Sequence, residues 1–259
     1  MTPAQPIDTR AVCPWHLPGP RWYAGLAAAI ALTVIFLDTG FARAMHGAPA
    51  WLNEAFQAIT ATGESTYSLV PLGLAWLVAA AAWLAQKDRG EAGEAAVALQ
   101  AIGFLFVAIA GSGIATNVVK QVIGRSRPVL LDTLDYSGFH PFAFDYAFQS
   151  FPSGHANTVF AAAVALAVLA PRWRWGLIAI ATLFALSRAV IAAHYLGDVI
   201  AGGALAYLTT LWLRDRMAAR GWLFERTQGG GSRLRPEAAA LLAIGLPGGR
   251  SSVLPGRQP

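Results

Sequence analysis

The stretch AAHYLGDVIAG, Ala192–Gly202, joins two long apolar runs of this 259-residue chain. It carries a histidine and an aspartate four residues apart, in surroundings that are almost free of charge. A membrane-spanning helix needs about 20 mostly apolar residues, and the runs on either side of this stretch approach that length. The stretch therefore predicts a tight turn between two membrane helices, with an ionisable pair at the membrane surface.

The composition also indicates a membrane protein. Hydrophobic residues make up 56% of the sequence, charged residues only 13%, and the mean hydropathy is +0.48. Soluble domains carry about 25% charged residues. The net charge of +5 does not indicate nucleic acid as a partner, because the basic residues lie between apolar runs and in the tail and form no basic, aromatic-laced stripe.

Six apolar runs predict an all-α fold, a six-transmembrane helix bundle with an extramembrane loop over the active site. The runs cover residues 22–37, 67–85, 95–119, 154–170, 175–193 and 196–213. Their hydrophobicity is continuous and does not alternate, so the strands of a membrane barrel are not expected. The predicted organisation is an N-terminal cytoplasmic arm (1–21), a transmembrane domain (22–214) and a cytoplasmic, largely disordered tail (215–259).

The charges of the loops predict the orientation. Basic residues gather on one side of the six runs, at Arg10, Arg21, Lys87, Arg89, Arg172, Arg174, Arg214, Arg216 and Arg220. This side is the cytoplasm by the positive-inside rule. The features fit a bacterial inner membrane with the opposite face toward the periplasm. That face receives residues 39–66, in which PAWLNEAFQAIT can form a short interfacial helix, the loop 120–152 and the turn at His194.

The first of three polar clusters on that opposite face is KQVIGRSRP, Lys120–Pro128. It keeps Lys120, Arg125 and Arg127 on the side where the orientation rule disfavours cations. Lys120 and Arg127 are the candidate anion-binding residues. The alternative is that these side chains snorkel at the end of a helix.

The second cluster is FPSGHAN, Phe151–Asn157. Ser153 is a good N-cap for the apolar run that follows. Gly154 lets a ligand approach the backbone closely, and the amides of a helix start attract anions. His155 then lies in the first turn. The alternative is an ordinary capped helix with an incidental histidine.

The third cluster is SRAVIAAHYLGD, Ser187–Asp198. If the segment is helical, Asp198 can hydrogen-bond one ring nitrogen of His194, which leaves the other nitrogen free to attack. Arg188 is a cation inside an apolar run, which is costly unless it is paired or functional. The alternative for the His–Asp pair is a capping contact. Together, the three clusters supply cations, amides and two histidines at one membrane face, a combination that suits a phosphoryl group.

The three clusters resemble the signature of the type 2 phosphatidic acid phosphatase superfamily, in its membrane lipid phosphatase branch. That signature is Lys, six residues and Arg-Pro; then Pro-Ser-Gly-His; then Ser-Arg, five residues, His, three residues and Asp. Every key position is filled here, in the same order, and the resemblance covers about residues 67–213.

The resemblance implies a role for each matching residue. His194 is the nucleophile that forms a phosphohistidine, Asp198 orients it, and His155 protonates the leaving oxygen and then activates water. The implied ligands of the phosphate are Lys120, Arg127, Ser153, Gly154 and Arg188. Neither a metal nor a cofactor is implied.

The resemblance implies hydrolysis of a phosphomonoester or pyrophosphate on a lipid headgroup. The substrate is a phospholipid, isoprenoid or lipid A phosphate, and the sequence does not decide among them or give the oligomeric state. Residues Glu64 and Ser65 either reach the headgroup or cap a helix, and Tyr136 and His140 are either substrate contacts or interfacial aromatics. Two other functions stay open: a phosphotransferase that uses the same phosphohistidine, and a non-enzymatic scaffold or transporter.

Overall fold

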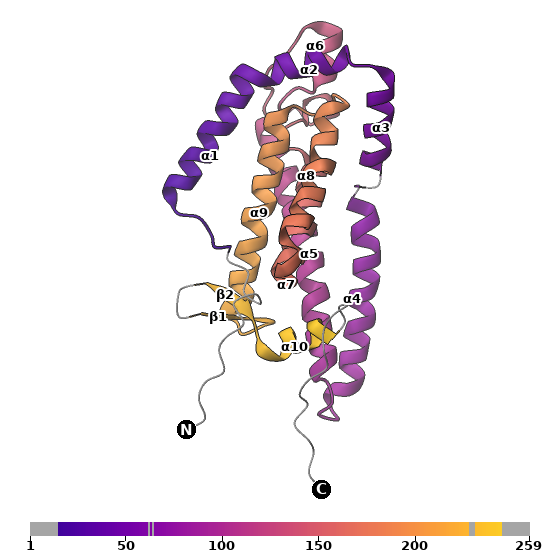
Figure 1. Cartoon of the computed structure of the whole chain (residues 1–259), viewed down its shortest axis with the longest axis vertical. Helices are drawn as coiled ribbons and strands as arrows, with labels where there is room; N and C mark the ends of the chain where they lie inside the picture. The colour runs from indigo at the N-terminus through magenta and orange to yellow at the C-terminus, as the bar shows by residue number, and fades with distance from the viewer. Residues whose placement is uncertain (1–14, 62, 64, 228–230, 245–259) are drawn as a thin grey trace.

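The structure is a computed structural model that describes residues 15–61, 63, 65–227 and 231–244. This part of the chain is helical except for one two-stranded hairpin (Figure 1). The helices are α1 Pro20–Leu32, α2 Asp38–His46, α3 Ala50–Ala61, α4 Ser65–Lys87, α5 Gly93–Ile123, α6 Pro128–Leu134, α7 Gly154–Leu169, α8 Arg174–Val190, α9 Leu196–Ala219 and α10 Pro236–Ile244. The shorter elements are a π-helical turn η2 Thr33–Leu37, the 3₁₀ turns η3 Tyr146–Phe148 and η4 Pro171–Trp173, and the strands β1 Phe224–Arg226 and β2 Ser232–Leu234.

Within the described residues, five helical stretches, not six, are long and apolar enough to cross a membrane. They are Pro20–His46, Ala50–Lys87, Gly93–Ile123, Pro171–Val190 and Leu196–Ala219. The predicted fourth span is α7, which is apolar but only 16 residues long. It ends at Leu169 because Pro171 starts a 3₁₀ turn, and the residue before a proline is disfavoured in the α conformation.

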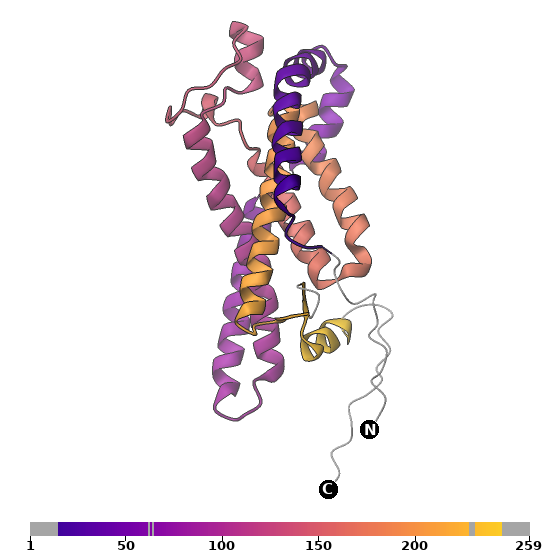
Figure 2. The ribbon, with the colours of Figure 1, turned by 90° about the vertical axis from the view of Figure 1, so that its left-hand side faces the viewer.

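The N-terminal run bends at η2, so α2 lies across one end of the bundle while α1 runs along its side (Figure 1). The helix predicted within PAWLNEAFQAIT is present as α3. At the end of the bundle opposite α2, the α4–α5 hairpin extends beyond the other helices (Figure 2).

Helix α7 is the centre of the bundle and packs against α5, α8 and α9. Its buried side chains are mostly small, and small residues let helix backbones approach closely. One close approach is to Gly202 of α9, where a Cβ atom would lie 2.4 Å from the carbonyl oxygen of Ser153. The start of α7 is therefore held directly against the first turns of α9.

The segment between α5 and α7 forms a loop that carries α6 and η3. Gly124 ends α5 in the left-handed conformation, with φ of 60°. The loop then folds back, so that the amide of His140 donates to the carbonyl of Gly124 at 2.7 Å. A Cβ atom at position 124 would collide with the backbone of His140, so only glycine fits there.

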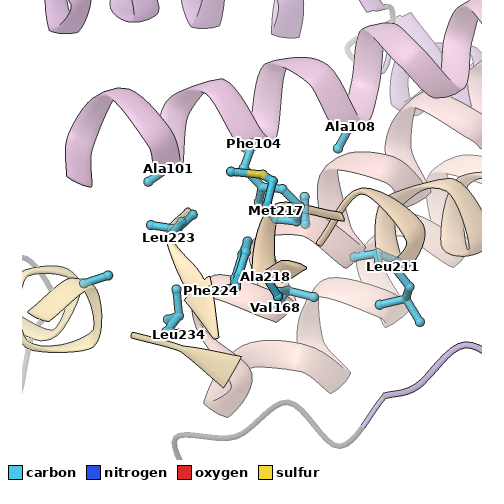
Figure 3. Packing of buried hydrophobic residues seen from close by; sticks show 13 residues of the cluster. Ala101, Phe104, Ala108, Val168, Leu211, Met217, Ala218, Leu223, Phe224 and Leu234 are labelled. Atoms are coloured by element: carbon cyan, nitrogen blue, oxygen red, sulfur yellow. The ribbon is translucent and has the colours of Figure 1, made fainter. Parts of the chain in front are cut away.

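The prediction of a largely disordered tail is wrong for its described part. Helix α9 continues to Ala219, β1 pairs antiparallel with β2, and α10 follows. Leu223 and Phe224 are buried in one cluster with Phe104 of α5 (Figure 3). The rings of Phe104 and Phe224 are 5.0 Å apart. The tail folds because these apolar side chains bury surface against α5 and α9. Residues 228–230 and 245–259 lie outside the described residues.

Candidate active site

The three polar clusters of the sequence meet at one end of the bundle. Lys120 and Arg127 both donate to the carbonyl oxygen of Gln149, and the amide of Ser153 donates to the carbonyl oxygen of Asp198 at 2.9 Å. This end of the bundle carries α2 and α6 (Figure 1). The predicted site residues lie on these elements: Lys120 in the last turn of α5, Arg127 before α6, Ser153, Gly154 and His155 at the start of α7, Arg188 in the last turn of α8, His194 between α8 and α9, and Asp198 in the first turn of α9.

His194 is buried, and its Nδ1 atom faces the carboxylate of Asp198. The distance from Nδ1 to Oδ2 of Asp198 is 3.6 Å, and Ser150 Oγ lies 3.5 Å from the same nitrogen. Because His194 precedes α9 and is not part of it, the distance from Nδ1 to Oδ2 is longer than the helical hydrogen bond that the sequence suggested. The other ring nitrogen, Nε2, is therefore the one available to attack a substrate.

The imidazole of His194 is neutral at pH 7. Burial lowers its pKa to about 4, and the positive charges of Arg127 and Lys120 act in the same direction, while Asp198 opposes them. Neutral imidazole is the form that can act as a nucleophile. Arg127 also donates to the carbonyl oxygen of Ala193, the residue directly before His194.

Asp198 is completely buried and accepts three hydrogen bonds. The donors are Arg125 Nη1 at 2.7 Å, Ser150 Oγ at 2.6 Å and the backbone amide of Tyr195 at 2.9 Å. A buried carboxylate is stable only when it is paired and hydrogen-bonded in this way. These contacts fix the position of the carboxylate beside His194.

A second buried carboxylate, Asp38 of α2, holds the other side of Arg125. Asp38 Oδ2 lies 2.9 Å from Arg125 Nη1, and Asp38 Oδ1 accepts from the amide of Gly197 at 2.9 Å. Burial acts to lower the pKa of Arg125, but the carboxylates of Asp198 and Asp38 outweigh it and raise the pKa. The N-terminal run is thereby tied to the first turn of α9.

The sequence interpretation missed the roles of Asp38, Arg125 and Ser150. A signal for Asp38 was available, because an aspartate inside an apolar run is costly unless it has a partner. Arg125 was noticed as a cation on the unexpected side, but its two carboxylate partners lie far away in the chain. Nothing in the local sequence indicates that Ser150 reaches Asp198.

Lys120 and Arg127 are buried cations whose hydrogen bonds go to neutral carbonyl oxygens. Lys120 Nζ donates to Gln149 at 2.7 Å, and Arg127 donates to Tyr146 at 3.0 Å and to Ala193 at 3.2 Å. Burial lowers the pKa of Arg127, Tyr146 and Asp198 oppose this, and the nearby charge of Arg188 lowers the pKa further. Cations brought together with neutral acceptors favour the binding of an anion between them. These bonds also place the loop between α5 and α7 over the site.

His155 and Arg188 meet at a residue of α3 that the sequence interpretation missed. Thr60 Oγ1 accepts from Arg188 Nη1 at 3.0 Å and lies 3.4 Å from His155 Nε2. Ser153 is the N-cap of α7, as predicted, because its hydroxyl oxygen accepts from the amide of Ala156. The start of α7 thus directs its first-turn amides and His155 toward the same region as the cations.

A cavity of about 470 Å³ lies beside His155, between α4, α5 and α7. Ser65 lines this cavity. Glu64 lies outside the described residues. Tyr136 and His140 pack around Phe148, with the rings of His140 and Phe148 4.7 Å apart, as expected for aromatic side chains at an interface.

Comparisons with known proteins agree with the motifs. The model of the PAP2 superfamily matches residues 101–222. The lipid A 1-phosphatase of Rhizobium etli is 32% identical over 212 residues, which are 81% of this chain and 90% of that protein. The chain belongs to the PAP2 superfamily. It is a membrane lipid phosphatase of that superfamily.

Two further relatives of the PAP2 superfamily are more distant. The undecaprenyl-diphosphatase of Sulfolobus acidocaldarius is 39% identical over 90 residues, which are 34% of this chain and 42% of that protein. The crystal structure of a transmembrane PAP2-type phosphatidylglycerolphosphate phosphatase from Bacillus subtilis shares the fold, with a TM-score of 0.51 and 22% identity. The structural match covers 76% of this chain and 92% of the Bacillus subtilis chain.

The matched PAP2 region contains all three polar clusters but not the whole site. Asp38 and Thr60, which contact Arg125 and Arg188, precede residue 101. Ser65, in the wall of the cavity, precedes it too. The N-terminal third of the chain therefore adds groups around the family's motifs.

Proposed function

We propose that this chain removes a phosphate from lipid A, or from a closely similar lipid, through a phosphohistidine on His194 and without a metal. The proposal is supported by two relatives called lipid A 1-phosphatases, which are matched over 90% and 86% of their lengths. The observation that carries the chemistry is the position of neutral His194, with Nδ1 turned to Asp198 and with Lys120 and Arg127 beside it.

In the first step the phosphate lies among Lys120, Arg127 and Arg188, at the start of α7. His194 Nε2 attacks phosphorus, so that an N–P bond forms while the bond from phosphorus to the lipid oxygen breaks. His155 gives its proton to that oxygen, and the dephosphorylated lipid leaves. The cations and the amides of α7 stabilise the charge that spreads over the equatorial oxygens.

In the second step water replaces the lipid. His155, now neutral, accepts a proton from the water, whose oxygen attacks phosphorus while the N–P bond breaks. Inorganic phosphate leaves and His194 is neutral again. Asp198 stabilises the positive charge that His194 carries while it holds the phosphoryl group, and Arg125 and Ser150 keep Asp198 in place.

We also propose that α7 crosses the membrane as the fourth of six spans and that the site faces the periplasm of a bacterial inner membrane. A helix of 16 residues is about 24 Å long, and the loop before it and η4 after it extend this length. With six spans, the basic residues at the ends of α4 and α9 lie in the cytoplasm, as the positive-inside rule requires.

The test is a phosphate-release assay with the purified full-length protein in detergent and a chelator. The substrates are lipid A, phosphatidylglycerol phosphate, phosphatidate and undecaprenyl diphosphate, and His194→Ala protein is the blank. We expect the fastest release from lipid A and none from the variant. A strict requirement for a divalent metal, or substantial activity of His194→Ala, would refute the mechanism.

The same experiment separates hydrolysis from phosphoryl transfer. Adding a lipid alcohol to the assay offers the phosphohistidine a second acceptor. The proposal predicts that the phosphate still appears as inorganic phosphate, in an amount equal to the lipid consumed. Quantitative transfer to the added lipid would show that the chain is a phosphotransferase.

A further inference from the structure

The cavity between α4, α5 and α7 adjoins the active site on the side of His155. It has a volume of about 470 Å³, within the range of pockets that bind small molecules. Its lining residues are Ser65, Thr66, Leu69, Ile109, Ala110, Gly113, Ile114, Thr116, Asn117, Gly154, His155 and Thr158. Gly154 and His155 are thus shared with the phosphate site, whereas His194 is not among the lining residues.

This position is the one that a leaving group would take. In an in-line displacement the nucleophile and the leaving oxygen lie on opposite sides of phosphorus. If His194 attacks and His155 protonates the leaving oxygen, the lipid side of the scissile bond must lie next to His155. The cavity is the space beside His155 that can hold the first chemical unit of the lipid.

The lining mixes apolar and polar side chains, and its described residues include no acidic or basic group apart from His155. Five of the lining residues carry a side-chain hydroxyl or amide: Ser65, Thr66, Thr116, Asn117 and Thr158. Such groups bind uncharged hydroxyl-bearing units well. A leaving group that carries its own phosphate, as an isoprenyl diphosphate does, would require cations here, and the described residues of the cavity wall supply none.

The hydroxyl of Thr116 gives independent evidence for a ligand. Thr116 is 1% exposed, and its Oγ1 atom has no hydrogen-bond partner among the described residues. A buried hydroxyl without a partner is costly, so native proteins rarely keep one without a use for it. Oγ1 is not exposed to the cavity in this structure, so a sugar hydroxyl supplies the missing hydrogen bond when the Thr116 side chain turns toward it.

The cavity also reaches the surface that faces lipid. Ile114 is one of its lining residues and is 67% exposed. A substrate can therefore place its polar unit in the cavity while its acyl chains stay in the bilayer. This arrangement suits a phosphorylated sugar lipid better than a diacylglycerol phosphate, because the ester groups of the latter have few hydroxyls to offer.

We propose that this cavity binds the sugar unit that carries the scissile phosphate, and that it selects glycosyl phosphate lipids over isoprenyl diphosphates. The inference rests on the proposed function, because it uses His155 as the acid on the leaving-group side. Residues Ser65 and Thr66 of α4 contribute to the selection from outside the region matched by the family model.

Gly113 offers a direct way to fill the cavity. It lines the cavity, and a Cβ atom added there would meet no other atom within 4 Å. Gly113→Leu should therefore occupy the space without displacing the backbone. Gly25→Leu is the matched control, since Gly25 of α1 is exposed and has the same freedom.

The experiment compares kcat/KM for lipid A and for undecaprenyl diphosphate in the unmodified protein and in three variants. We expect Gly113→Leu to lower kcat/KM for lipid A at least about tenfold and to change the value for the diphosphate less than about threefold. Thr116→Val, which removes the hydroxyl and keeps the shape, should lower the value for lipid A about three- to tenfold through a higher KM. Gly25→Leu should change neither value.

Equal losses for both substrates, or no loss for either, would overturn the inference. A binding measurement separates this inference from the proposed chemistry. In His194→Ala protein, which cannot form the phosphohistidine, lipid A should raise the melting temperature, and adding Gly113→Leu should abolish the increase. If lipid A stabilises both proteins equally, the cavity does not bind the sugar, whatever the outcome of the phosphate assay.

Discussion

Replacing Asp38 by asparagine tests whether the first helical run supports the active site. The substitution keeps the shape and an oxygen that can accept from the amide of Gly197, but it removes the negative charge beside Arg125. Arg125 is 2% exposed, so the charge that loses a partner cannot turn to water. In the variant, Arg125 still has the carboxylate of Asp198 as a partner. The variant should therefore unfold more easily and hold Asp198 less firmly.

The size of the effect follows from the geometry. Removing one partner of a buried ion pair costs about 3–5 kcal/mol when the remaining charge is left alone. Here Asp198 still compensates Arg125, so the loss is closer to that of one charged hydrogen bond, ~2 kcal/mol. For a chain of this size such a loss lowers the melting temperature by roughly 4–8 °C.

Thermal unfolding of the purified protein in detergent measures the shift, and Asp135→Asn is the control. Asp135 also pairs with a basic residue of α2, Arg43, but both side chains are exposed, and surface pairs contribute little. We expect the control to melt within about 1 °C of the unmodified protein. If Asp38→Asn melts at the same temperature as the control, the buried pair does not stabilise the fold as argued. We also expect kcat to fall in Asp38→Asn and to stay unchanged in the control.

The remaining predictions concern the nucleophile, the packing of α7 and the tail. Because the pKa of His194 is about 4, the phosphohistidine should form nearly as fast at pH 5.5 as at pH 7 in single-turnover experiments. With an ordinary imidazole the rate would fall about tenfold between these pH values. A tenfold fall in the measured rate would show that His194 is not kept neutral by burial. His194 binds a proton below pH 6.5 in the unfolded state but only near pH 4 in the folded state. The protein should therefore become less stable as the pH falls from 6.5 to 4. Thermal unfolding at pH 7 and at pH 5 measures this loss of stability. Gly202→Val should abolish folding, because its Cβ would lie 2.4 Å from the carbonyl oxygen of Ser153; recovery of an active, monodisperse protein would contradict this. Phe224→Ala should destabilise the protein by about 3–5 kcal/mol, since Phe224 is completely buried; an unchanged melting temperature would mean that the tail does not pack on α5.

Local patterns in the sequence determined much of this protein. Apolar runs predicted the helices, Ser153 predicted the cap of α7, and the three motifs supplied all eight predicted site residues. Helices and caps depend on neighbours within one or two helical turns, and the resemblance of the three motifs to the family signature implied the roles of the site residues.

Only the tertiary structure decided how the site is supported. Asp38 reaches Gly197 across 159 positions, and Thr60 reaches Arg188 across 128. The periodicity of apolar residues in the sequence does not reveal such pairs, because they form only when separate helices pack against each other. The same reason explains the tail, where Phe224 is ordered only by the surface of α5, and the cavity, whose walls come from three helices. The sequence can show that a charged residue inside an apolar run needs a partner. The packing of the whole bundle determines which residue that partner is.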